Sequence, residues 1–375
     1  MQTNFELKKH NTIKIFQALR TQKSVSRKEL AKITGLSWGS VSSICNELIV
    51  KNIVLAEKEA SGGGRPAERL ILNPTHFLQL GIDINSIGLH FVVVNLCGDV
   101  VYSQFTAIES RDKNDLLQLL FDCTKAILAK NPNVIGINLS MQGKINRKTG
   151  VSLRTNFFKD WKNIPLVSLF EEKFSLPTSL YHDPDCLLSY HLQSDIRLKN
   201  ATDGFVIRID DGIGMARLLQ GKPYQTGDDT SYELGHIISV PDGRMCPCGK
   251  KGCLETYASL RGMKEIYMQT YRANEEFTSL LKEKNAQALS VLQSATDHLG
   301  IAIANLFTLS APTFILLDGA LFAYAPYCFE HIKQNAEKRL GAPCNLLLAT
   351  YTKEAPAIGA CLLTIEKNTE NFLFA

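Results

Sequence analysis

The 375-residue sequence has no uncharged apolar run near the ~18 residues that a membrane-spanning helix needs. Its first residues, MQTNFELKKHNTIKIF, also lack the uninterrupted apolar stretch of a secretory signal peptide. Only 21% of the residues are charged and 45% are hydrophobic, which excludes a disordered chain and a fibrous repeat. These absences predict a soluble, cytoplasmic protein, and the length of the chain predicts two or three domains.

The net charge of +4 is small, but it is distributed unevenly along the chain. Residues 1–70 contain 12 Lys and Arg against 6 Asp and Glu, a net charge of +6. Residues 71–375 contain 29 against 31, a net charge of −2. A basic segment joined to a nearly neutral remainder is typical of a chain in which one module contacts nucleic acid.

Helix signals recur in the first fifty residues. Apolar residues follow helical spacing from Lys8 to Arg20, and the capping box Ser26-Arg27-Lys28-Glu29 begins a second helix. Gly35 then supplies a turn, and Ser37 is the expected N-cap of a third helix. This order of helix, short turn and helix predicts a helix-turn-helix.

Two strand-like runs, 53–56 and 69–72, flank the flexible sequence Gly62-Gly63-Gly64-Arg65-Pro66 and predict the wing of a winged helix. The outward face of the third helix could approach base edges in a major groove, and an Arg on the wing tip could enter a minor groove. A helical protein-interaction module with a Gly linker is the alternative, but the charge and the order of elements favour DNA. The candidate DNA-binding residues are Arg27, Ser37, Trp38, Ser40, Ser42, Ser43, Asn46 and Arg65.

After Leu72 the pattern changes to strands alternating with helices. Strands are expected at 78–84, 89–96, 134–139, 178–182, 204–209 and 313–317, and helices at 113–130 and through much of 257–309. A strand meander followed by alternating helices and strands occurs twice, which predicts two α/β lobes that face a cleft.

Three of the ten cysteines fall within eight residues of one another, in His236-x9-Cys-Pro-Cys-Gly-Lys-Lys-Gly-Cys. One imidazole and three thiolates, from His236, Cys246, Cys248 and Cys253, supply the four ligands of a structural Zn²⁺ site. A redox motif would need a Cys-x-x-Cys pair beside a βαβ pattern, and unligated thiols fit poorly in a loop rich in Gly and Lys. Four protein ligands leave no open position, so the metal is expected to shape the cleft and not to catalyse.

The pattern Glu233-x-Gly-His236, followed by Cys-x-Cys-Gly-x-x-Gly-Cys-x-Glu255, resembles the signature of the ROK (repressor, ORF, kinase) family of sugar kinases and sugar-responsive repressors. The Gly-Arg-Pro wing is similar to the family's repressor branch, the branch of the N-acetylglucosamine and xylose repressors. Further landmarks are Gly81-Ile82-Asp83-Ile84, Gly136-Ile137, Gly143, Gly150, Asn156, Trp161, Asp183, Gly212-Ile213-Gly214, Pro312, Gly319 and Gly359-Ala360.

The resemblance implies an α/β chain in which a winged helix-turn-helix precedes a two-lobed, actin-like and ribonuclease-H-like sugar-kinase fold with a zinc loop. The expected domains are a DNA-binding domain at 1–72, a small lobe at 73–195 completed by a C-terminal helix at 356–375, and a large lobe at 196–355 that holds the zinc loop and the oligomerisation helices. The family also implies a homodimer or homotetramer.

The resemblance implies a sugar site formed by Gly143, Asn156, His182, Asp183, Glu233, His236 and Glu255. His236 would face zinc with one ring nitrogen and the sugar with the other. Asp183 stands at the position of the family's kinase base, although from the residues alone it could simply cap a helix. His182 replaces the family's usual Asn, and His191 stands where a Glu is frequent; each could also be a structural histidine.

The nucleotide motifs depart from the kinase pattern in three places. Asp83-Ile84-Asn85-Ser86-Ile87 replaces Asp-Ile-Gly-Gly-Thr, Asp210-Asp211-Gly212 replaces Gly-Thr-Gly, and Asp318-Gly319 replaces Gly-Gly. The lost glycines and added carboxylates disfavour a triphosphate. We therefore expect a repressor of carbohydrate-utilisation genes that binds operator DNA and a sugar or sugar phosphate, not an enzyme. The alternatives are an ATP-dependent sugar kinase with a DNA-binding domain, and an adaptor that docks on a transporter or another regulator.

Overall fold

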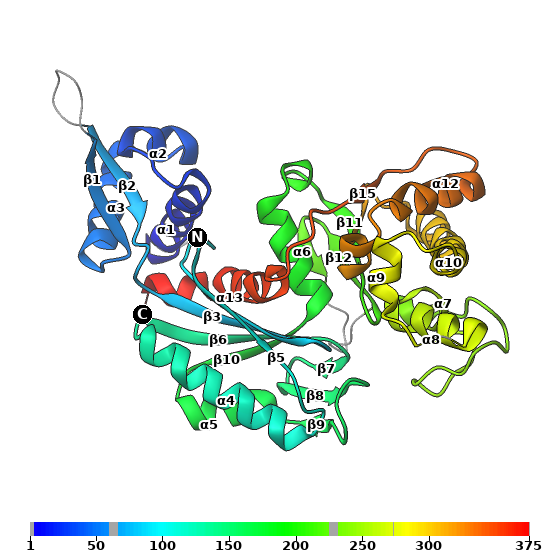
Figure 1. The fold of residues 1–375 in the computed structure, drawn as a ribbon. Helices are drawn as coiled ribbons and strands as arrows, with labels where there is room; N and C mark the ends of the chain where they lie inside the picture. Colours follow the sequence, from blue (N-terminus) through cyan, green and yellow to red (C-terminus); the bar gives the residue numbers. More distant parts are fainter. Residues whose placement is uncertain (1–3, 60–66, 225–231, 273, 375) are drawn as a thin grey trace.

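The computed structural model describes residues 4–59, 67–224, 232–272 and 274–374 (Figure 1). At one end lies an N-terminal unit of three helices and a two-stranded antiparallel sheet. We call this unit the head; its elements are α1 (Asn4–Gln22), α2 (Arg27–Thr34), α3 (Trp38–Val50), β1 (Val54–Glu59) and β2 (Ala67–Leu72). The wing tip with Arg65 lies outside the described residues.

The helix signals in the head are confirmed in detail. The Ser26 hydroxyl accepts a hydrogen bond from the Glu29 N–H, and the Glu29 carboxylate accepts one from the Ser26 N–H, which completes the capping box. Gly35 ends α2 in the left-handed conformation, with φ at 71°. Ser37 caps α3 by accepting from the Ser40 N–H. Local sequence therefore determines both ends of the turn between α2 and α3.

The first lobe is built on a five-stranded sheet in the order β10-β6-β3-β4-β5. The strands β3 (Leu78–Ile84), β4 (Gly88–Val94) and β5 (Val100–Ala107) form an antiparallel meander, and β6 (Val134–Met141) and β10 (Thr178–His182) run parallel to β3. Helices α4 (Lys113–Lys130) and α5 (Leu166–Phe174) pack on this lobe, beside a small sheet of β7 (Lys144–Asn146), β8 (Val151–Arg154) and β9 (Lys162–Ile164).

The second lobe repeats this topology, with a five-stranded sheet in the order β13-β12-β11-β14-β15. The strands are β11 (Asp203–Ile209), β12 (Ile213–Leu219), β13 (Lys222–Tyr224), β14 (Ile315–Asp318) and β15 (Leu346–Leu348). The lobe also contains 3-10 turns η1 (Ile196–Leu198) and η2 (Leu234–His236), and helices α7 (Glu255–Ala258), α8 (Leu260–Tyr271), α9 (Phe277–Lys282), α10 (Ala286–Ser310), α11 (Ala320–Tyr324) and α12 (Cys328–Leu340). The prediction of two α/β units is confirmed.

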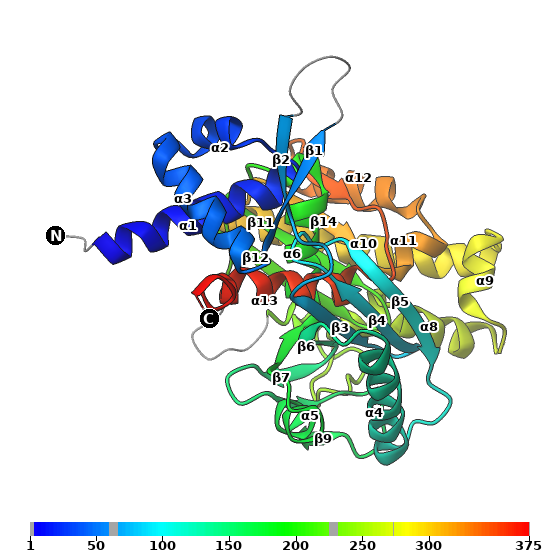
Figure 2. The same ribbon diagram turned by 90° about the vertical axis from the view of Figure 1, so that its left-hand side faces the viewer.

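Two helices, α6 (Asp183–Ser194) and α13 (Ala355–Phe374), pack against each other and connect the parts of the molecule (Figures 1 and 2). Gly359 permits the close approach of α13 to α6, and Gly81 permits that of α13 to β3. A Cβ on Gly359 of α13 would lie 1.8 Å from the Cys186 carbonyl oxygen of α6, and one on Gly81 of β3 would lie 2.1 Å from the Ala357 oxygen of α13. The C-terminal helix is thus in backbone contact with both the first sheet and α6.

The head and the body share one hydrophobic core. Phe16 and Leu19 of α1 belong to the same buried cluster as Ile358 and Leu362 of α13.

Polar contacts between head and body surround this core. Arg20 donates to Gln193 at 2.9 Å, Lys23 donates to Asp99 at 2.6 Å, Lys9 pairs with Glu370, and Lys51 donates to the Leu373 carbonyl. A movement of α6 or α13 would therefore also displace residues of the head.

Several strands differ in extent from the prediction; the strand expected at 134–139 ends at Met141, and the strand expected at 313–317 spans Ile315–Asp318. The strand expected at 89–96 ends at Val94, because the Asn95 side chain accepts hydrogen bonds from the Cys97 and Asp99 N–H groups and forms the turn. The strand expected at 53–56 continues to Glu59, with Glu57 opposite Arg69 in the β1–β2 ladder. Within the described ranges, no helix is long and apolar enough to span a membrane.

Candidate functional site

One cavity of about 340 Å³ receives residues of both lobes, a volume within the usual range for small-molecule sites. Every residue that the sequence assigned to the sugar site lines this cavity: Gly143, Asn156, His182, Asp183, Glu233, His236 and Glu255. The structure therefore brings together side chains that are up to 112 positions apart in the chain, as the difference between 143 and 255 shows. The sequence pattern had not indicated several other lining residues: Lys144, Arg154, Thr155, Phe157, Arg208, Tyr232, Lys250 and Arg261.

The backbone around the cavity explains two of its glycines. Gly143 follows β6 with φ at 102°, and a Cβ there would lie 2.6 Å from the Arg154 carbonyl oxygen. A Cβ on Gly212 would lie 2.8 Å from the Glu255 carboxylate. The turn after β6 therefore requires glycine at position 143, and Gly212 leaves room for the Glu255 carboxylate beside the β11–β12 turn.

Asp183 stands at the junction of β10 and α6 and is part of a buried ionic network. The Arg208 guanidinium donates from Nη1 to Asp183 Oδ2 at 2.9 Å and from Nε to Asp210 Oδ2 at 2.5 Å. Burial raises the pKa of Asp183 to about 7; the Arg208 charge opposes this rise, and Asp83 and Asp210 add to it. A buried carboxyl group that titrates near neutrality at a cavity wall is typical of a functional position.

This raised pKa predicts a pH-dependent contribution to stability. Because Asp183 binds its proton more tightly in the folded protein, its contribution is present at low pH and is lost as pH rises through about 7. Asn cannot ionise, so Asp183→Asn should become more stable relative to wild type between pH 5 and pH 8, by on the order of 2–3 kcal/mol. Urea unfolding at a series of pH values measures this, with the exposed Asp122→Asn as control; a pH-independent difference would contradict it.

Glu255 begins α7 and is held from two sides. Its Oε1 accepts from Arg261 Nη2 at 2.6 Å, and its Oε2 accepts from the Ile213 N–H at 3.1 Å. The carboxylate is buried, so these two donors offset the cost of removing its charge from water. Glu255 thereby fixes the β11–β12 turn against the loop that carries the cysteines.

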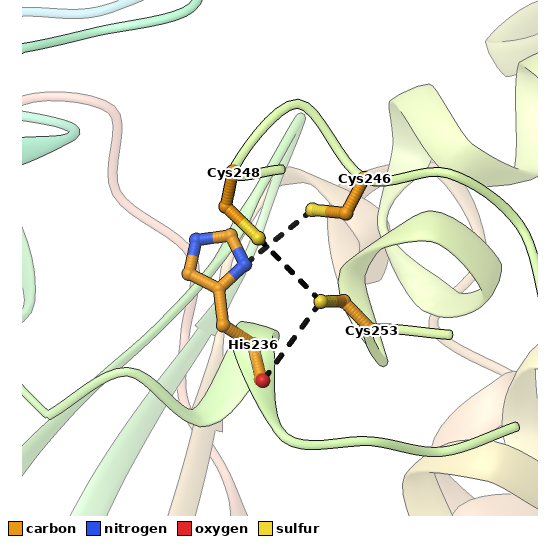
Figure 3. Close-up of side chains that lie close together, drawn as sticks. All are labelled: His236, Cys246, Cys248 and Cys253. Carbon is orange, nitrogen blue, oxygen red and sulfur yellow. Dashed lines mark hydrogen bonds between the residues drawn. The ribbon is translucent and has the colours of Figure 1, made fainter. Parts of the chain in front are cut away.

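His236, Cys246, Cys248 and Cys253 converge on one point, and their ligand atoms all lie within 4.8 Å of one another (Figure 3). The Sγ atoms of Cys248 and Cys253 are 3.7 Å apart, and Cys246 Sγ lies 3.6 Å from His236 Nδ1. This cluster could hold a metal ion. The Nε2 atom of His236 lies 3.7 Å from Glu233 Oε2 in the cavity, so the two ring nitrogens face the cluster and the cavity respectively.

The three segments that correspond to the nucleotide motifs of the sugar kinases form hydrogen bonds within this chain. Ser86 donates to Asp211 across the two lobes, and Asp210 accepts from the Ala320 N–H. Asp318 contacts His191 Nε2 at 2.6 Å. His191 lies in a buried pair with this aspartate and does not line the cavity, which fits the structural interpretation of His191.

In the head, the N-cap Ser37 and the α3 residues Trp38, Ser43 and Asn46 are exposed, whereas Ser40 and Ser42 are half-buried. Trp38 is 58% exposed, although it is a large apolar side chain. Arg27 differs from the others because its guanidinium donates to Asn46, Ser42 and Glu68 and is largely buried. Arg27 therefore positions α3 against β2 in this structure.

Two lobes of like topology, a cavity lined by both and an N-terminal helical unit define a two-lobed α/β protein with an N-terminal head packed against its C-terminal helix. The chain belongs to the ROK family, whose family model matches residues 79–367.

Comparisons with individual proteins extend this assignment. The chain is 26% identical over 372 residues to a xylose repressor of Bacillus spizizenii, covering 96% of each chain. It is similar, with a TM-score of 0.78, 23% identity and 98% coverage of both chains, to the crystal structure of a ROK family transcriptional regulator homologous to Escherichia coli Mlc. A ROK glucokinase from Streptomyces griseus in complex with glucose and AMPPNP gives a TM-score of 0.66 at 20% identity, covering 76% of this chain and 98% of that one.

Proposed function

We propose that this protein is a sugar-responsive, DNA-binding transcriptional repressor of carbohydrate-utilisation genes. The observation that carries the proposal is the head, which shares a hydrophobic core with α13 and lies upstream of residues 79–367. The glucokinase matches 98% of its own length to only 76% of this chain, whereas the xylose repressor matches 96% of both. The extra length relative to the kinase is therefore shared with a repressor.

The geometry of the head supports a winged helix-turn-helix at residues 1–72. The helix α3 would enter the major groove with Ser37, Trp38, Ser43 and Asn46 foremost, while Ser40, Ser42 and Arg27 hold it in place. The net charge of +6 in residues 1–70 supports the approach to phosphates. Arg65 would enter a minor groove from the tip between β1 and β2.

We assign the rest of the chain to the small lobe at 73–195, the large lobe at 196–355 and a C-terminal helix at 356–375 that completes the small lobe. The backbone contacts of α13 with β3 and α6 support this division. The sugar would be held by Gly143, Asn156, His182, Asp183, Glu233, His236 and Glu255, which share one cavity.

The metal is proposed to be structural Zn²⁺. Ligand atoms at zinc–sulfur and zinc–nitrogen bond lengths of about 2.3 and 2.1 Å in a tetrahedron lie roughly 3.5–3.8 Å apart. The separations of 3.7 Å and 3.6 Å in the cluster fit this arrangement. When bound, zinc would fix the loop 246–253 against η2 and orient the His236 ring, while the opposite ring nitrogen faces Glu233 at 3.7 Å.

The contacts in the former nucleotide site support a regulator without kinase activity. A transferred phosphate would have to displace the hydrogen bonds that Asp210 and Asp211 receive from Ala320 and Ser86, and it would meet two carboxylates. Asp183, the position of the family's kinase base, is already paired with Arg208.

We infer that sugar binding closes the two lobes and moves α6 and α13. The cavity residue Asp183 begins α6, and Gln193 near the other end contacts Arg20 of the head. Paired heads in a homodimer or homotetramer must fit two half-sites on the order of 34 Å apart, so a small rotation weakens operator binding. By linkage, DNA lowers the affinity for the sugar by the same factor.

The direct test measures binding of the purified chain to an operator that the protein itself selects from a random DNA library. D-Xylose, D-glucose and N-acetylglucosamine, with their phosphates, are added in turn, and ADP release from ATP is measured in parallel. We expect one sugar to weaken DNA binding at least tenfold, with no sugar-dependent ADP release. Sugar-dependent ADP release that is lost in Asp183→Asn would support the kinase instead, and full DNA binding with no sugar affinity would support the adaptor.

A further inference from the structure

Gln142 and His182 line the cavity from two neighbouring strands of the first lobe. Gln142 follows β6, and His182 ends the parallel strand β10, where it pairs with Met141. The two residues are only 8% and 7% exposed. Nevertheless, Gln142 Oε1 and His182 Nδ1 have no hydrogen-bond partner among the residues that the structure describes. Buried polar atoms are nearly always hydrogen-bonded, so two orphans in one cavity wall indicate a missing ligand or water.

Both orphan atoms are hydrogen-bond acceptors. Gln142 Nε2 donates to Asp210 Oδ2 at 3.3 Å, which fixes the amide with Oε1 as its free end. Burial lowers the pKa of His182, so its imidazole is neutral near pH 7. Its Nε2 lies 3.6 Å from Asp183 Oδ1, which favours the hydrogen on Nε2 and leaves a lone pair on Nδ1. A molecule that satisfies both atoms must therefore bring two hydrogen-bond donors.

We propose that Gln142 is a further ligand-contacting residue and that Gln142 and His182 together form a subsite for two hydroxyl donors of a sugar. The inference rests on the proposed function, because it assumes that the cavity binds a sugar. A phosphate ester at the same place would bring lone pairs and negative charge against two acceptors. The hydroxyls at this subsite are therefore unsubstituted, whatever group the sugar carries elsewhere.

The subsite also joins the ligand to the opposite lobe. Gln142 belongs to the first lobe, and its partner Asp210 lies in the β11–β12 turn of the second. Asp210 accepts further hydrogen bonds from Arg208 and from the Ala320 N–H, so it is fixed within its own lobe. A hydroxyl bound to Gln142 thus closes a chain of hydrogen bonds from the ligand across the cleft.

Gln142→Met tests the inference, because methionine keeps the length of the side chain but removes both hydrogen-bonding atoms. Calorimetric titration of the full chain uses D-xylose, D-glucose and the monodeoxy analogues of each. We expect wild type to bind one deoxy analogue at least tenfold more weakly than its parent sugar. We expect Gln142→Met to bind the parent at least tenfold more weakly and no longer to distinguish it from that analogue.

The exposed Gln118→Met on α4 is the matched control and should keep the wild-type affinities; an unfolding temperature within a few degrees of wild type shows that Gln142→Met is folded. If Gln142 only supports Asp210, the variant will bind every sugar more weakly by one factor and still reject the deoxy analogue, which overturns the inference. Unchanged sugar binding by the variant also overturns it and leaves the proposed function standing. A wild type that binds no sugar removes the proposed function and the inference together.

Discussion

If the cysteine cluster holds the proposed zinc, Cys253→Ser is expected to lose that metal and to bind sugar at least tenfold more weakly than wild type. The Cys253 sulfur is fully buried and lies 3.7 Å from that of Cys248. A serine hydroxyl is not deprotonated near neutral pH, so the cluster would retain three good ligands. Without the metal, the loop 246–253 is no longer fixed to η2, and both Glu233 and Glu255 lose their position at the cavity.

The same variant should lower the unfolding temperature by roughly 5–10 °C, because metal binding adds its free energy to that of folding. Elemental analysis, calorimetry and sugar titration measure the three effects. Cys344→Ser, at a half-buried thiol outside the cluster, is the control and should keep one zinc per chain. A Cys253→Ser protein that retains a full equivalent of zinc and the wild-type sugar affinity would exclude the assigned ligand set.

The sequence predicted those parts of the fold that local chemistry decides. The helix at 113–130 and the strands at 78–84 and 178–182 have the predicted bounds, because caps and apolar patterns specify them. The predicted end of β4 was wrong by two residues, because the apolar run did not reveal the turn that Asn95 forms. The shared core of head and body could not be predicted, because it depends on how α1 and α13 meet in space.

The candidate site likewise contains residues that the sequence could predict and residues that only the fold brings together. The cysteine cluster could be predicted from the sequence alone, because its residues are close together in the chain. The seven cavity residues were assigned through a family pattern, and the structure places all of them in one cavity. The role of Arg208 could not be predicted, because an Arg near the end of a buried strand carries no local signal of its partners. Only the fold brings Arg208 between Asp183 and Asp210, and Gln142 beside His182.

Ser43→Glu is expected to lower the affinity for the selected operator at least 100-fold while leaving sugar binding unchanged. Ser43 is exposed on α3, and a carboxylate there would face the phosphates and base edges of the major groove. Competition titration at several salt concentrations measures the loss. It should be larger at low salt, where repulsion between like charges is least screened.

Ser43→Glu should add a negative charge to α3 without disturbing the structure of the head. Ser43 is exposed and its side chain makes no hydrogen bond with the described residues, and glutamate is a good helix former, so α3 should remain intact. Ser279→Glu introduces the same charge at an exposed serine of α9, outside the head, and controls for the change in net charge. If both variants lose operator affinity equally, the effect comes from the total charge, and α3 is not the helix that contacts the DNA bases. If Ser43→Glu binds DNA like wild type, the head is better explained as a protein-interaction module. A selective loss in Ser43→Glu, with the sugar affinity retained, would show that DNA contacts α3 and that the sugar binds elsewhere, in a body that the substitution leaves intact.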